Sequence, residues 1–217
     1  MTNAIMLLAA LPLLAGLLLA ERGGRTRQVL VVKSALSCLF VLAALMQPHP
    51  LPGYAGLVLA GLVLGLIGDV CLALPGQTAF RLGLLAFLAG HLLYVAAFLG
   101  LAAPAAWGGP APLVIALAGV LVFLWLRPRA GKLLIPVAAY ILAISLMLSC
   151  AWAVFQTPGL PVRGVSAVLL GALLFYLSDL CVARDRFVSP GFINRLLGLP
   201  LYYAGQFLLA FSVGWLG

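Results

Sequence analysis

The stretch GYAGLVLAGLVLGLIGDVCLAL, residues 53–74, is long and apolar enough to cross a bilayer as one helix, and its single charge is at Asp69. A hydrocarbon core about 30 Å thick needs about 20 apolar residues to cross it. An ionisable side chain within that core costs roughly 3 kcal/mol or more, so it usually faces the protein interior and marks a functional site. The stretch therefore predicts a membrane helix that carries a functional carboxyl group.

The context of Asp69 occurs a second time in the chain. Residues 68–73, Gly-Asp-Val-Cys-Leu-Ala, match residues 178–183, Ser-Asp-Leu-Cys-Val-Ala, at an offset of 110 residues. One helix later, residues 89–93, Ala-Gly-His-Leu-Leu, match residues 204–208, Ala-Gly-Gln-Phe-Leu, at an offset of 115. The pattern predicts two parallel repeats and places a second buried carboxyl group, Asp179, at the same depth as the first.

The composition indicates an integral membrane protein. Of the 217 residues, 65% are hydrophobic and 7% are charged, which excludes a soluble domain. We expect an all-α bundle of eight transmembrane helices in a single domain, residues 1–217, with repeat halves at about 1–104 and 105–217. The expected helices are at residues 3–20, 29–46, 53–74, 80–101, 112–126, 133–155, 162–183 and 196–216.

The basic residues predict the orientation of this bundle. Eleven of the twelve fall in or beside alternate connections: Arg22, Arg25, Arg27, Lys33, Arg81, Arg127, Arg129, Lys132, Arg184, Arg186 and Arg195. The positive-inside rule assigns those connections to the cytoplasm and both termini to the outer face of the cell membrane, expected to be a bacterial inner membrane. The first apolar run is expected to be a retained helix, because its basic residues follow it instead of preceding it. The net charge of +8 therefore indicates topology and contact with anionic lipid, and no nucleic-acid partner is expected.

The uncommon polar side chains are expected to gather in the cytoplasmic half of the bundle. Asp69 and Asp179 both lie five residues from the cytoplasmic end of their helices, which is about 7–8 Å below that boundary. They are the candidate catalytic pair. The candidate residues for binding or orienting a substrate are Lys33, His91, Tyr94, Tyr140, Tyr202 and Gln206.

Each candidate also has a simpler interpretation. The aspartates could be structural groups hydrogen-bonded to backbone or tyrosine, His91 and the tyrosines could pack, and Lys33 could extend to the headgroups. Asp69, Asp179 and His91 could together supply three zinc ligands, although we expect no metal or cofactor. The four cysteines show no metal-binding or disulfide spacing and are expected to act as small hydrophobic residues.

Taken together, several motifs resemble the YhhN-like family of membrane proteins, the lysoplasmalogenases. They run from about residue 29 to the C-terminus and comprise Lys33, Gly68-Asp69, His91–Tyr94, Tyr140, Gly171–Phe175, Ser178-Asp179 and Tyr202–Gln206. One departure is Ser34, where family members often have proline. The resemblance implies hydrolysis of the vinyl ether bond of lysoplasmalogens, which yields a fatty aldehyde and glycerophospho-ethanolamine or -choline. A lysophospholipid in the bilayer would then be the substrate, and the oligomeric state is left open.

Two carboxyl groups suit that chemistry. A vinyl ether is cleaved by protonation of its β-carbon, and water then attacks the resulting oxocarbenium ion. Burial and mutual repulsion are expected to keep one aspartic acid protonated while the other stays ionised, and either could be the acid. His91, Tyr94 and the polar residues near the C-terminus would orient water or the ether oxygen, and Lys33 would pair with the lipid phosphate or tune the acids. The alternatives are a small proton-coupled transporter, disfavoured because the outer half has almost no polar residues, and a metal-dependent lipid hydrolase.

Overall fold

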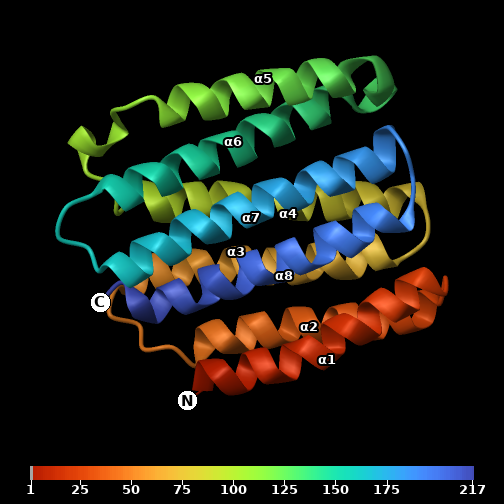
Figure 1. Cartoon of the computed structure of the whole chain (residues 1–217), viewed down its shortest axis with the longest axis horizontal. Helices are drawn as coiled ribbons and strands as arrows, with labels where there is room; N and C mark the ends of the chain where they lie inside the picture. Colours follow the sequence, from red (N-terminus) through yellow and green to blue (C-terminus); the bar gives the residue numbers. More distant parts are fainter. Residues whose placement is uncertain (1) are drawn as a thin grey trace.

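The computed structural model describes residues 2–217, with side chains from Asn3 onward, and over this range the chain is all-helical, as expected (Figure 1). The α-helices are α1 (Thr2–Arg22), α2 (Thr26–Leu45), α3 (Pro52–Ala73), α4 (Gln77–Leu99), α5 (Ala111–Ala130), α6 (Leu134–Gln156), α7 (Val162–Phe187) and α8 (Phe192–Trp215). Two short 3₁₀ helices, η1 (Pro104–Trp107) and η2 (Gly131–Leu133), flank α5.

The helices run alternately up and down with their axes nearly parallel (Figure 1). The α3/α4 and α7/α8 hairpins pack most extensively and form the centre of the bundle. The α1/α2 hairpin covers one side of this centre, and α5 and α6 cover the other. The connections that follow α1, α3, α5 and α7 therefore share one end of the molecule, and both termini lie at the opposite end.

Seven runs of the described chain are long and apolar enough to cross a membrane. Eight spans were expected, and the difference arises because α5, η2 and α6 follow one another without a non-helical residue and so form one run, Ala111–Gln156. Large aliphatic side chains cover the outward surface, as lipid contact requires; on α5 they include Leu113, Leu117, Leu121 and Leu124. The fold is that of a membrane protein.

Glycines allow the two central hairpins to close tightly. A Cβ atom placed on Gly90 would lie 3.3 Å from the carbonyl oxygen of Gly61, where α4 crosses α3. The same relationship recurs where α8 crosses α7, with 2.9 Å from Gly205 to the carbonyl oxygen of Gly171. Small residues at such crossings let helix backbones approach in lipid. This close approach carries the polar side chains of α4 and α8 into the interior.

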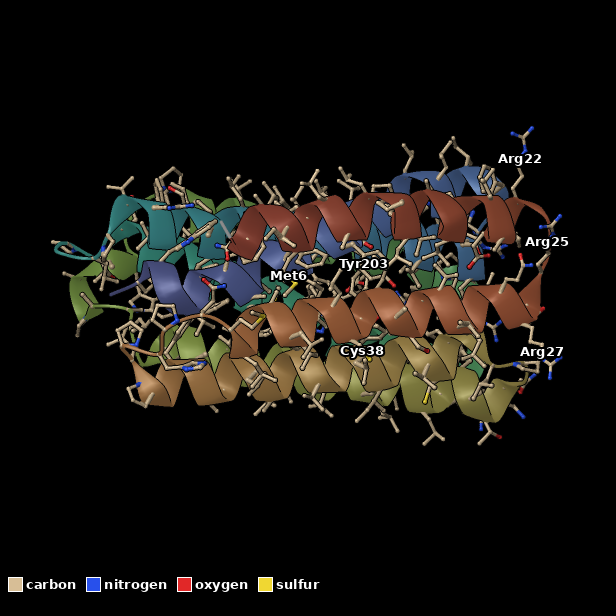
Figure 2. The ribbon with its side chains drawn as sticks, turned by 90° about the horizontal axis from the view of Figure 1, so that it is seen from below. Met6, Arg22, Arg25, Arg27, Cys38 and Tyr203 are labelled. Atoms are coloured by element: carbon tan, nitrogen blue, oxygen red, sulfur yellow. The ribbon has the colours of Figure 1, made fainter. Side chains whose placement is uncertain are left out.

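One end of the bundle is basic. Figure 2 shows Arg22, Arg25 and Arg27 projecting from the end where α1 turns into α2. The last turns of α5 and α7 add Arg127, Arg129, Arg184 and Arg186 at the same end. Asp69 and Asp179 both lie near this end of their helices, so the charged groups share one half of the molecule.

Candidate active site

Asp69 is a fully compensated buried carboxylate. Its side chain is 1% exposed, and the ammonium nitrogen of Lys33 lies 3.1 Å from Oδ1. The hydroxyl groups of Ser37 and Tyr202 are 2.6 and 2.7 Å from Oδ2 and can donate hydrogen bonds to it. A buried charge with a counter-ion and two donors is stable as the anion. Helices α2 and α8 therefore supply Asp69, on α3, with a counter-ion and two hydrogen-bond donors.

A chain of hydrogen bonds behind Tyr202 sets the direction of its hydroxyl group. The amide nitrogen of Gln206 donates to the Tyr202 oxygen at 3.2 Å, and Tyr94 donates to the Gln206 carbonyl oxygen at 2.9 Å. Gln206 is wholly buried, and it fits because Gly65 has no Cβ, which would lie 2.7 Å from the amide nitrogen. With its oxygen accepting from Gln206, Tyr202 is left to donate to Asp69.

Asp179 has different neighbours. Tyr140 donates a hydrogen bond to its Oδ2 at 2.9 Å, and the Nε2 atom of His91 lies 3.6 Å from the same oxygen. The ring nitrogen Nδ1 of His91 is 2.7 Å from the carbonyl oxygen of Phe87, which only accepts, so Nδ1 carries the proton and a neutral ring has its lone pair on Nε2. Nε2 has no hydrogen bond to any described residue. No lysine or arginine of the described chain pairs with Asp179.

Aromatic rings lie between the two aspartate sites. The ring centroid of Phe175 is 4.7 Å from that of His91 and 5.3 Å from that of Tyr202. Phe87 packs edge-on against both Phe175 and Tyr202. No hydrogen bond joins the two carboxyl groups within residues 2–217, so each has its own set of partners.

Both aspartates nevertheless line a single cavity of about 480 Å³. That volume is within the range of pockets for small ligands. Lys33, Tyr140 and Tyr202 also line it, whereas His91, Tyr94 and Gln206 do not. Gln206 hydrogen-bonds Tyr202 and Tyr94 hydrogen-bonds Gln206, while His91 lies beside Asp179. One wall is apolar and is formed by α4, α5 and α6, with Leu84, Val122, Leu126, Ile141 and Ile144. The cavity suits an amphiphile that brings a reactive group beside two carboxyl groups and an alkyl chain along an apolar wall.

Sequence reasoning missed several residues of this cavity. Ser37 hydrogen-bonds Asp69, and its one sequence signal was its place one helical turn after Lys33. Glu21 and Asp185 were not among the candidate residues, yet both line the cavity beside Arg195. All four acidic residues of the chain therefore border the same space. Within the described chain, no three His, Cys, Asp or Glu side chains are grouped to hold a metal ion.

Residues 28–213 match the YhhN family. This chain belongs to that family. It is 36% identical to the lysoplasmalogenase TMEM86A of Bos taurus over 71% of the chain and 64% of the relative. It is 36% identical to a lysoplasmalogenase of Mycobacterium bovis over 76% of the chain and 61% of the relative, and 37% identical to human lysoplasmalogenase TMEM86B over 75% and 66%. The chain thus spans less than two thirds of the length of these relatives. No solved structure matches it.

Proposed function

We propose that this protein is a membrane hydrolase that cleaves the vinyl ether bond of lysoplasmalogens. The observation that carries the proposal is the pair of aspartates with contrasting partners on one amphiphile-sized cavity. The lysoplasmalogenase names of the relatives support the same substrate class. The products are a fatty aldehyde and a glycerophospho-alcohol.

In this proposal Asp179 is the acid. The Asp179 side chain is 17% exposed and has no lysine or arginine partner among the described residues, so its anion would lack compensation and the neutral acid is favoured. Asp179 gives its proton to the β-carbon of the vinyl ether, and the electron pair of the double bond forms the new C–H bond. The α-carbon and the ether oxygen then share the positive charge of an oxocarbenium ion, beside the newly formed Asp179 carboxylate.

Water completes the reaction. It adds to the α-carbon and returns a proton to the Asp179 carboxylate, which restores the acid and leaves a hemiacetal. The hemiacetal then loses its hydroxyl proton as its bond to the glycerol oxygen breaks, and that oxygen takes up a proton through water, which releases the aldehyde and the alcohol. Asp69 stays ionised beside Lys33 and orients the Tyr202 hydroxyl group at the cavity wall. His91 lies behind Asp179 and sets the direction of its carboxyl group.

We propose further that all eight α-helices cross the membrane, with the basic end in the cytoplasm. A continuous helix of 46 residues would be about 70 Å long, more than twice the thickness of the hydrocarbon core. The chain instead reverses at Gly131, whose φ of 51° ends α5, and α6 packs back against α5. The positive-inside rule then assigns the cavity mouth to the cytoplasmic leaflet and both termini to the outer face.

The proposal also includes an internal duplication of the central hairpins. Tyr94 packs on Gly61 between α4 and α3, and Leu209 packs on Gly171 between α8 and α7. The two glycines are 110 residues apart and the two side chains 115 apart, which are the offsets of the sequence matches. Equal contacts at equal offsets support two copies of one hairpin, each contributing one aspartate.

The test is aldehyde release by the purified protein in detergent or vesicles. Lysoplasmalogen should yield a fatty aldehyde, whereas the ester and saturated alkyl ether analogues should yield none. In D₂O, one deuterium should appear on the carbon next to the aldehyde group, because that carbon takes the acid's proton. Free aldehyde incubated in D₂O controls for later exchange. Aldehyde without this deuterium would contradict carbon protonation, and no aldehyde would contradict the function.

A further inference from the structure

The mouth of the cavity carries both signs of charge. Glu21, Asp185, Arg186 and Arg195 line it at the basic end of the bundle. They come from three helices, α1, α7 and α8, and the cavity continues from them to Asp69 and Asp179. A ligand whose reactive group lies at the aspartates therefore places its opposite end among these charges.

Arg186 is held against an aromatic ring and has no anionic partner among the described residues. Its guanidinium carbon lies 4.1 Å from the ring centroid of Phe80, so the planar group rests on an aromatic face. It forms no salt bridge with a carboxylate of the described chain. A guanidinium group binds phosphate through two parallel N–H donors. Lys33 also lines the cavity, but it lies deeper than Arg186 and is already paired with Asp69.

Glu21 and Asp185 differ in how fully their oxygens are used. Arg195 bridges them, at 3.3 Å from Oε2 of Glu21 and 3.4 Å from Oδ2 of Asp185. Asp185 also accepts hydrogen bonds from the Gly191 amide and from Asn194, which hold the turn between α7 and α8. The other oxygen of Glu21 has no salt bridge or hydrogen bond to a described residue. Glu21 is therefore the carboxylate available to an amine, and Asp185 is structural.

We propose that this mouth is a subsite for a zwitterionic phospho-amine headgroup, with Arg186 on the phosphate and Glu21 on the ammonium. The inference rests on the proposed function and adds to it the residues that hold the headgroup. Arg186 lies seven residues beyond Asp179 on α7, which is about 10 Å along the helix. A glycerol unit and a phosphodiester separate the vinyl ether from the amine, and they span the distance between Asp179 and Arg186. The alkenyl chain then follows the apolar wall.

The experiment uses three substrates with the same alkenyl chain on glycerol. One carries phosphoethanolamine, the second carries phosphate without the amine, and the third has a free hydroxyl group. For the wild-type protein, KM should be lowest for the phosphoethanolamine substrate and highest for the substrate with a free hydroxyl group. The kcat should be similar for all three, because the headgroup lies away from the reacting carbons.

Two variants test the assigned roles. Arg186→Gln should raise KM about tenfold for both phosphate-bearing substrates and leave the headgroup-free substrate unchanged. Glu21→Gln should raise KM for the phosphoethanolamine substrate and leave the phosphate substrate unchanged or improved, since a repelling carboxylate is removed. Arg22→Gln is the matched control, because Arg22 is an exposed arginine beside Glu21 that does not line the cavity.

The outcomes separate the two proposals. Aldehyde release from all three substrates with equal KM in the wild type would overturn the headgroup subsite and leave the vinyl ether chemistry standing. Equal effects of Arg186→Gln and Arg22→Gln would overturn the assignment of Arg186 in favour of general surface charge. No aldehyde from any of the substrates would instead overturn the proposed function itself.

Discussion

The Nε2 atom of His91 lies 3.6 Å from Oδ2 of Asp179 and has no hydrogen bond to any described residue. This distance is too long for a hydrogen bond, and a small movement of either side chain would close it. Catalytic hydrogen bonds are often loose in a free enzyme and tighten when substrate binds. The wholly buried ring is therefore placed to accept a hydrogen bond from the protonated Asp179 and to orient its carboxyl group.

His91→Phe should lower kcat about tenfold or more and leave KM nearly unchanged, because His91 does not line the cavity. Steady-state aldehyde release measures both constants. His49→Phe is the control, since His49 is the chain's other histidine and is exposed in the connection between α2 and α3. A His91→Phe variant with wild-type kcat would remove His91 from any role in the proton transfer.

Asp179→Asn and Asp69→Asn should both abolish turnover, but only the second should strongly destabilise the fold. Asparagine at residue 179 keeps size and polarity, and it leaves no charge unpaired. Asparagine at residue 69 leaves Lys33 buried without its counter-ion, which costs about 3–5 kcal/mol. Thermal unfolding in detergent, measured beside aldehyde release, checks both effects.

The double variant Lys33→Gln/Asp69→Asn separates stability from chemistry. Removing both charges should restore much of the lost stability, since no buried ion remains unpaired. Activity should stay absent if the reaction needs the Asp69 carboxylate to orient the Tyr202 hydroxyl group at the cavity wall. If the double variant is stable and releases aldehyde near the wild-type rate, Asp69 has only a structural role.

Activity should survive exhaustive chelation, and the saturated alkyl ether analogue should act as a competitive inhibitor. That analogue shares the chain and headgroup of the substrate, but it has no double bond to protonate. The measurements are aldehyde release after chelator treatment and the inhibition constant of the analogue. Inactivation by chelator with recovery on adding zinc would favour a metal-dependent hydrolase, although no three-residue ligand cluster occurs in the described chain.

The orientation predicts which end an impermeant thiol reagent can reach. Gln28→Cys and Ser189→Cys, each in a background with the four native cysteines replaced by alanine, should resist labelling from outside intact cells. Both positions are exposed at the basic end, so they should label once the membrane is permeabilised. A cysteine in the connection between α2 and α3 is the control and should label from outside. The reverse pattern would place the cavity mouth in the outer leaflet.

Sequence reasoning predicted the helices well because helix position in a membrane depends on local hydrophobicity. The span expected at residues 53–74 is α3, Pro52–Ala73, and the one expected at 162–183 begins at the first residue of α7. The largest shifts occur at the ends of α5 and α7, which run on to Ala130 and Phe187, and at the start of α8, which begins at Phe192 although it was expected from residue 196. Polar residues such as Asn194 and Arg195 obscured that start, because helices extend beyond the hydrocarbon core.

The amino-acid sequence by itself determined that two carboxyl groups lie near the same end of their helices in an apolar helical bundle, because helix position follows from the local pattern. Only the tertiary structure decided that these two groups differ chemically. Asp69 and Asp179 have nearly identical flanking sequences, yet α2 and α8 bring an ammonium group and two hydroxyl groups to the first. Helices α4 and α6 bring a histidine and a tyrosine to the second. Such partners come from distant segments, and only the packing of helices determines which of them meet.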